Sequence, residues 1–158
     1  MMNRAVTSVL FCAVLCSCYA SSVAYRDCGS TLSNVTEVSI PGCHEMDARC
    51  TLIPGVNMML SIKFIPNVDI SQVNVFAHGV VYHVSSPLPL DEHDVCKDPY
   101  SGIQCPLERG QEYNYMYMLS LHKKTPNYRL DLKWEFQDAE GEKIVCVIIP
   151  VQVRVVKD

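Results

Sequence analysis

The residues of this chain that are best suited to chemistry are its cysteines. The sequence contains nine of them, and Cys12, Cys16 and Cys18 lie close to its start. No C-x-x-C pair is present, so the spacing disfavours the common structural zinc sites. Removal of the first 20 residues as a signal peptide, which is predicted below, would leave six cysteines: Cys28, Cys43, Cys50, Cys96, Cys105 and Cys146. An even number of cysteines in an exported chain indicates disulfides.

Six cysteines can pair in about 15 ways, and the sequence by itself does not select one. Short spacing makes local bridges plausible across 43–50 and across 96–105, which would leave Cys28 and Cys146 as partners. That last bridge would close almost the whole domain. The chain-entropy model gives such a loop about 4.7 kcal/mol of stabilisation and each short loop about 2.5 kcal/mol.

Motifs of the common enzyme classes are absent from the sequence. It has no G-x-S-x-G elbow, no H-E-x-x-H pair and no Gly-rich phosphate loop. His78 has apolar neighbours and fits a structural role. The acidic segment 91–94 lies in a polar loop, where solvation explains it better than weak cation binding does. The sequence therefore predicts a protein that is not an enzyme, with no catalytic residue, no metal and no cofactor.

The first 20 residues predict a secretory signal peptide. Arg4 precedes a short apolar run, and small residues follow it up to Ala20. A bilayer span would need about 20 apolar residues, more than this run provides. Cleavage is expected after Ala20, with Ala24 as the alternative, and 21–158 is then one domain. The net charge of −4 argues against nucleic-acid binding, which favours basic surfaces.

The alternation of apolar and polar residues predicts the strands that would position the cysteines. The clearest alternation places Trp134 on an apolar face, and a polar turn at 138–141 joins it to a second such run. Gly79 predicts a bulge or a close approach of the backbone. No segment reads as an amphipathic helix, so an all-β sandwich is expected, with a small barrel as the alternative. The expected strands are 56–64, 72–84 as a pair or one bent strand, 113–121, 128–137 and 145–153.

Short motifs spread over 21–158 resemble one known family. They include Asp27-Cys28-Gly29-Ser30, Pro41-Gly42-Cys43, Cys105-Pro106-Leu107, Trp134-x-Phe136-x-Asp138 and Ile149-Pro150-Val151. Together with the cysteine register, they resemble the Niemann-Pick type C protein two family of secreted ML lipid-recognition domains. The resemblance implies an immunoglobulin-like β-sandwich of two antiparallel sheets with an apolar cavity between them. It also implies the disulfides Cys28–Cys146, Cys43–Cys50 and Cys96–Cys105.

The candidate ligand-binding residues come from the resemblance and from the inward strand faces. By the resemblance, most of them line or gate the lipid cavity of the family, and Tyr115 lies close to it. Without the resemblance, each would be interpreted as ordinary sandwich core. The full set is Ile40, Leu60, Ile62, Leu88, Tyr115, Leu119, Leu121, Trp134, Val147 and Ile149.

The function that the resemblance implies is lipid carriage. We expect a secreted monomer, or one in the lysosomal or endosomal lumen, that binds a cholesterol-like sterol. It would transfer the sterol between membranes or to a membrane acceptor, such as a lumenal domain of a sterol transporter. Leu88 and Val147 replace aromatic residues usual in sterol carriers of this type, so fatty acids and other small hydrophobic ligands are the alternative. Innate-immune lipid recognition, known for other ML proteins, is a further alternative.

Two surface features complete the prediction. Asn34-Val35-Thr36 is the only glycosylation sequon, so an N-linked glycan is expected at Asn34. Lys123 and Lys124 belong to a turn that lies near the cavity mouth in the family. They can attract the protein transiently to an anionic membrane surface, with an ordinary solvated turn as the alternative.

Overall fold

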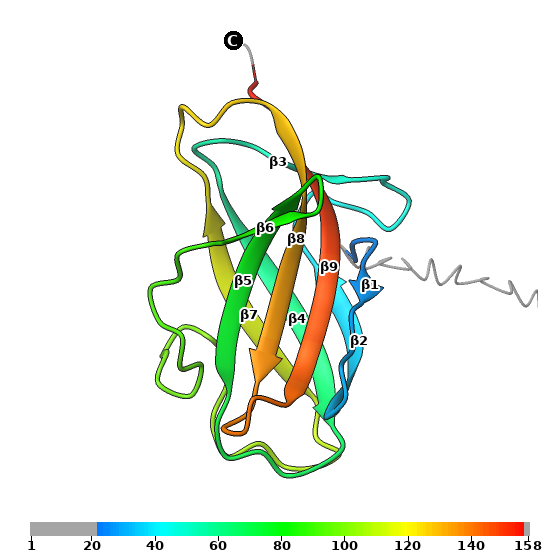
Figure 1. Ribbon diagram of the computed structural model, residues 1–158, viewed down its shortest axis with the longest axis vertical. Coiled ribbons are helices and arrows are strands. Elements are labelled where there is room, and N and C mark those ends of the chain that lie inside the picture. The colour runs from blue at the N-terminus through cyan, green and yellow to red at the C-terminus, as the bar shows by residue number, and fades with distance from the viewer. Residues whose placement is uncertain (1–21, 157–158) are drawn as a thin grey trace, which may run out of the picture.

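The computed structural model describes residues 22–156, so the predicted signal peptide lies outside the described residues. Two β-sheets pack face to face in this part of the chain (Figure 1), which confirms the sandwich and rules out the small barrel. No helix among the described residues could cross a membrane. The strands are β1 (Arg26–Asp27), β2 (Ser33–Ser39), β3 (Cys50–Leu52), β4 (Asn57–Pro66), β5 (Asn74–Val81), β6 (Val84–Pro87), β7 (Tyr113–Ser120), β8 (Tyr128–Gln137) and β9 (Lys143–Val153).

The two sheets differ in size. The larger has the order β1-β9-β8-β5-β6, and the smaller has the order β2-β4-β7. Neighbouring strands are antiparallel, apart from the short β3, which pairs with β9 in parallel. β8 and β9 lie at the centre of the larger sheet and present their alternating apolar faces to the smaller one (Figure 1).

The predicted segment 72–84 forms a strand pair rather than one bent strand. β5 and β6 are joined at Tyr82 and His83, whose φ angles of 47° and 66° are those of a tight hairpin turn. Gly79 marks a close approach and not a bulge, since a Cβ there would lie 3.0 Å from Cδ1 of Leu130. The polar segment that holds Asn34 was not predicted as a strand, but it forms β2. β2 pairs with β4 at the edge of the smaller sheet, where Ser33 and Val38 are buried and Asn34 stays exposed.

Aromatic residues fill one part of the space between the sheets. Phe64 of β4 and Phe136 of β8 have ring centroids 5.7 Å apart, and Tyr115 of β7 meets Phe136 edge to face at 4.7 Å. All three are almost completely buried. This part of the sandwich is therefore a packed core, where such ring pairs add to the energy of apolar burial.

The three expected disulfides are confirmed. Cα–Cα distances are 5.0 Å for Cys28–Cys146, 5.2 Å for Cys43–Cys50 and 5.5 Å for Cys96–Cys105. The first ties β1 to β9, and Oε2 of the buried Glu135 lies 3.6 Å from Sγ of Cys146.

The charge of Glu135 is held on the outer face of the larger sheet. Its Oε2 lies 2.8 Å from Nζ of Lys133 and 3.9 Å from Nζ of Lys143. Burial by itself would raise the pKa of Glu135. Hydrogen bonds from Lys133 and Gln137 and the charges of both lysines outweigh burial, so the pKa of Glu135 lies below its ordinary value.

Candidate functional site

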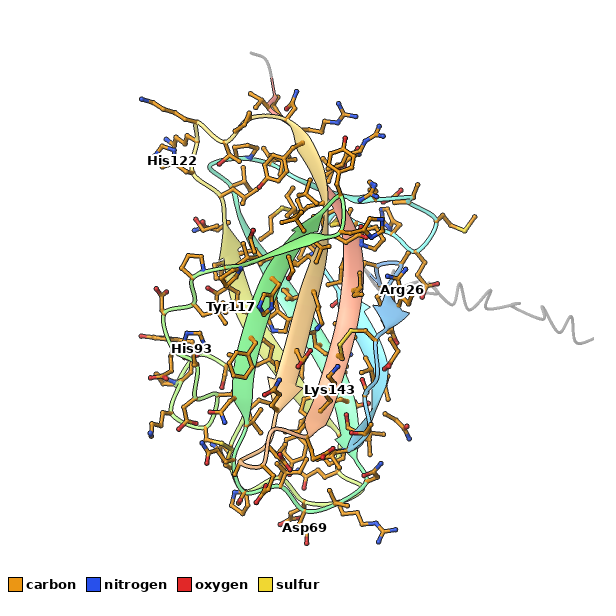
Figure 2. The ribbon with its side chains drawn as sticks, viewed as in Figure 1. Arg26, Asp69, His93, Tyr117, His122 and Lys143 are labelled. Atoms are coloured by element: carbon orange, nitrogen blue, oxygen red, sulfur yellow. A yellow bond between two sulfur atoms is a disulfide. The ribbon has the colours of Figure 1, made fainter. Side chains whose placement is uncertain are left out.

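A cavity of about 410 Å³ lies between the sheets, beside the packed aromatic core. That volume is in the range of small-molecule sites. The cavity extends from the middle of the molecule, where Tyr117 lies, toward the end that carries His122 (Figure 2). Its walls are mainly aliphatic and aromatic. The lining residues are Leu52, Leu88, Pro89, Leu90, Asp91, Tyr117, Met118, Leu119, Ser120, Leu121, Tyr128, Leu130, Leu132, Trp134, Val151 and Val153.

The strand alternation builds this cavity. Every second residue of β8 from Tyr128 to Trp134 lines it, and β7 and the end of β9 supply the facing and neighbouring walls. Tyr117 and Trp134 close its inner end, with ring centroids 5.0 Å apart. The half-exposed Tyr128 marks the other end. A strand advances about 3.4 Å per residue, so the β8 wall is roughly 20 Å long, which suits an elongated apolar molecule.

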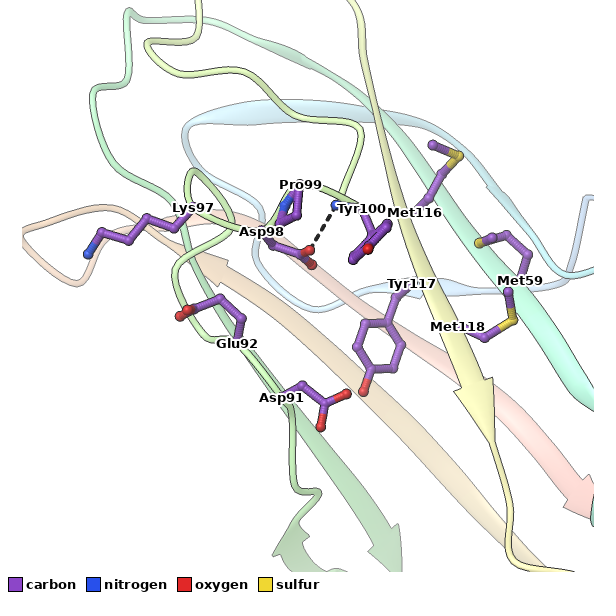
Figure 3. Close-up of a pocket in the computed structure, with 10 residues that line it drawn as sticks. All are labelled: Met59, Asp91, Glu92, Lys97, Asp98, Pro99, Tyr100, Met116, Tyr117 and Met118. Atoms are coloured by element: carbon purple, nitrogen blue, oxygen red, sulfur yellow. Dashed lines mark hydrogen bonds between the residues drawn. The ribbon is translucent and has the colours of Figure 1, made fainter.

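Few polar groups face the cavity. Asp91 is the one charged residue among its described lining residues, and no basic side chain lines it. Tyr117 points toward Asp91 (Figure 3). Burial, together with the negative charges of Asp91 and Asp98, raises the pKa of Tyr117, so its hydroxyl stays protonated at neutral pH.

A second hollow of about 590 Å³ lies beside the cavity and shares Asp91, Tyr117 and Met118 with it (Figure 3). Unlike the cavity, it is lined by further charged residues, Glu92, Lys97 and Asp98. In the acidic loop Nζ of Lys97 pairs with Asp94 at 3.1 Å, and Glu92 accepts a hydrogen bond from a backbone amide. Its charged lining makes this hollow a less suitable lipid site than the apolar cavity between the sheets. Residues 22–156 hold no group of three or more side chains suited to a metal ion.

The structure divides the ten predicted ligand-binding residues into two groups. Leu88, Leu119, Leu121 and Trp134 line the cavity. The other six do not line it, and their side chains belong to the buried core cluster. A role for them in ligand binding stays a prediction. They are Ile40, Leu60, Ile62, Tyr115, Val147 and Ile149.

The sequence analysis missed several lining residues. Leu130 and Leu132 share the apolar face of β8 with Trp134, and Val151 and Val153 share that of β9 with Ile149. The alternation therefore indicated the correct faces. It carried no signal for the position along the strands at which the packed core ends and the cavity begins.

Comparisons with known proteins agree with the fold. A family model described as ML domain matches residues 22–153. NPC intracellular cholesterol transporter 2 homolog a of Drosophila melanogaster is 35% identical over 147 residues, which cover 93% of this chain and 97% of that protein. NPC intracellular cholesterol transporter 2 of Bos taurus is 30% identical over 153 residues, covering 97% and 99%. The crystal structure of a Niemann-Pick type C2 protein from the Japanese carpenter ant superposes with a TM-score of 0.79 at 35% identity, covering 84% of this chain and 100% of that one.

Proposed function

The chain belongs to the ML domain family, and within it to the Niemann-Pick type C protein two family, and we propose that it is a carrier that binds a sterol between its two sheets. The observation that carries the proposal is the apolar cavity of about 410 Å³ in a chain whose similar proteins are named cholesterol transporters. The carrier would act as a monomer. It would deliver its sterol to a membrane, or to a lumenal domain of a membrane sterol transporter.

The energetics of the cavity suit a reversible carrier. Burying roughly 500 Å² of sterol surface at about 25 cal/mol/Å² contributes about 12 kcal/mol, against an association cost of about 4–15 kcal/mol. The balance allows binding that can be undone at an acceptor. Carriage of this kind involves no bond breaking, so we assign no catalytic role to any residue.

The charge at the cavity favours a neutral sterol over a fatty acid. Asp91, an exposed residue beside Tyr117, would repel a fatty-acid carboxylate placed near it, and no lining base would pair with that carboxylate. Two charges about 5 Å apart in partly exposed surroundings, with an effective dielectric constant of about 40, repel by roughly 1.7 kcal/mol. A sterol hydroxyl carries no charge and avoids this penalty.

Membrane contact would occur at the end of the sandwich where Tyr128 lies. The β5–β6 hairpin exposes 94% of Tyr82 and 66% of Val84, and the chain after β9 exposes 63% of Val156. Lys123 and Lys124 are exposed in the loop between β7 and β8 at the same end. Apolar side chains beside bases suit the surface of an anionic bilayer.

The disulfides fit the oxidising environment outside the cell or in an endosomal or lysosomal lumen.

The proposal is tested by equilibrium binding of the mature protein to a fluorescent sterol, with cholesterol and oleic acid as competitors. We expect cholesterol to displace the probe at stoichiometric concentrations, and oleic acid to compete at least tenfold more weakly. Asp91→Asn should narrow that difference. Failure of the protein to bind any sterol would rule the proposal out, and stronger competition by oleic acid would favour a fatty-acid carrier.

A further inference from the structure

The apolar cavity borders the second hollow at the edge of the smaller sheet. β7 is the last strand of that sheet, and segment 88–91, which follows β6, lines the cavity together with 117–121. The hollow of about 590 Å³ adjoins this place, and Asp91, Tyr117 and Met118 line both spaces. These three residues therefore form the border between the cavity and the hollow.

The backbone leaves this border open. The amide of Met116 donates a hydrogen bond to the carbonyl of Ser101 at 2.8 Å, and a Cβ on Gly102 would lie 2.9 Å from Cε of Met116, so the loop is packed against β7 there. In the described part of the chain, no further backbone hydrogen bond joins β7 to 88–105. Past Met116, side chains alone separate the cavity from the hollow.

Tyr117 is the one of the three shared residues that reaches into the sandwich. Met118 lies on the outer face of β7 and is 47% exposed, and Asp91 is exposed as well. Tyr117 projects from β7 toward the segment that holds Asp91 (Figure 3), and its ring centroid lies 5.0 Å from that of Trp134. The ring of Tyr117 therefore lies across the opening between the cavity and the hollow.

Tyr115, two residues earlier on the same face of β7, provides a contrast. It is 1% exposed and packs edge to face on Phe136 at 4.7 Å, within the filled core. Tyr117 is half-buried, and its hydroxyl makes no hydrogen bond to any described residue. Contact with Trp134 holds one side of the Tyr117 ring, while its other sides border the two spaces. Removing this ring would join the two spaces.

We propose that Tyr117 determines how long a ligand the carrier accepts, because its ring closes the inner end of the cavity against the hollow. This proposal rests on the proposed function and assigns a specificity-determining residue to it. A ligand that extends past the ring would have to enter the hollow. Pro99, Tyr100 and Met116 give the hollow apolar surface beside its charged groups, so an alkyl extension would find contacts there once the ring is removed.

The experiment measures competition against a fluorescent sterol by cholesterol and by two sets of extended sterols. One set carries a lengthened alkyl side chain, and the other consists of cholesterol esters of short fatty acids. The two sets extend opposite ends of the sterol, and the set extended at the inner end meets Tyr117. The unaltered protein should bind that set at least tenfold more weakly than cholesterol, since a closed apolar pocket rejects one extra methylene by roughly 10–200-fold. Tyr117→Ala should recover at least tenfold of that loss.

Two further variants provide matched controls. Tyr117→Phe keeps the ring and should preserve the rejection of extended sterols. Leu130→Ala enlarges the cavity at the β8 wall, and because Leu130 does not line the hollow, the rejection should persist there too. Rejection is read as the ratio of the affinities for cholesterol and for the extended sterol, so a general weakening of binding does not imitate a change. If Tyr117→Ala fails to fold, Tyr117→Leu replaces it.

The outcomes separate this proposal from the function on which it rests. If Tyr117→Ala binds cholesterol but rejects both extended sets as strongly as the unaltered protein does, the proposal is wrong and the carrier function stands. Equal acceptance of extended sterols by Leu130→Ala would also refute it, because cavity volume would then set the limit. So would an unaltered protein that binds both extended sets as tightly as cholesterol. If no sterol binds at all, the proposed function fails and this proposal fails with it.

Discussion

Filling the cavity should block sterol binding without unfolding the protein, and Val151→Phe is the substitution suited to this. Val151 points inward from β9 opposite Leu130, and both residues line the cavity. The added ring carbons would enter open space. If they bury roughly 40 Å² more apolar surface at about 25 cal/mol/Å², the gain is about 1 kcal/mol before the entropy cost of ordering the ring. The free energy of unfolding should therefore stay the same or rise slightly.

The same ring should exclude ligand. If it removes roughly 100 Å² of contact surface from the sterol, binding weakens by about 2.5 kcal/mol, or roughly 70-fold. The matched control is Ile149→Phe, two residues earlier on the same face of β9 but buried in packed core with no cavity beside its side chain. Overpacking there should destabilise the protein by about 1–3 kcal/mol.

The assay is chemical denaturation of both variants, followed by titration with a fluorescent sterol. Sterol binding by Val151→Phe at the affinity of the unaltered protein would refute the assignment of this cavity as the binding site. Equal destabilisation by the two substitutions would show instead that the region around Val151 is as tightly packed as the core around Ile149.

Four further expectations follow from the structure. Replacing both cysteines of the Cys28–Cys146 disulfide should lower the free energy of unfolding by about 4–5 kcal/mol, against about 2.5 kcal/mol for either short disulfide. Thermal unfolding of the three variants would rank these losses of stability. The folded-state pKa of Glu135 lies below its ordinary value of 4.5, so its ion pairs stabilise the fold above that pH and lose their effect as the pH falls through the lowered pKa. Glu135→Gln should therefore reduce the loss of unfolding free energy at acid pH. An unchanged loss would contradict the lowered pKa of Glu135. Replacing Lys123 and Lys124 with Ala should weaken binding to anionic vesicles by up to about 2 kcal/mol at low salt and less at high salt, whereas equal binding at every salt concentration would exclude them from docking. Sterol binding should change the emission of Trp134, and constant emission during binding that another method confirms would place the ligand away from its ring.

The sequence predicted the strands best where burial on one face is continuous. The strand expected at 128–137 coincides with β8, because the alternation there is unbroken and the strand pairs on both sides, with β5 and β9, in a sheet that buries one face. β2 was missed because its buried positions include Ser33, whose hydroxyl donates to the backbone carbonyl of Ile144. The sequence carries no signal for this buried hydrogen bond, because its acceptor lies on β9 in the other sheet.

The sequence indicated which strand faces border the cavity, but not where along the strands the cavity lies. Ile149 and Val151 are both branched apolar residues, both inward and both nearly inaccessible, yet only Val151 lines the cavity. The difference arises across the sandwich, where large rings such as Phe136 fill the space between the sheets in one part and leave it open in another. Periodicity within a strand contains no information about which side chains of the opposite sheet reach across.

The central claim, that the space between the sheets carries a sterol, is tested most directly by identifying the lipid that the protein acquires in a cell. The protein would be purified from a secreting eukaryotic culture without added lipid, and its extract analysed quantitatively by mass spectrometry, with Val151→Phe prepared in parallel. We predict close to one sterol per protein molecule, and a strong loss of sterol in the variant. A protein that carries only fatty acid or phospholipid, or one whose sterol content is the same in the variant, would contradict the account.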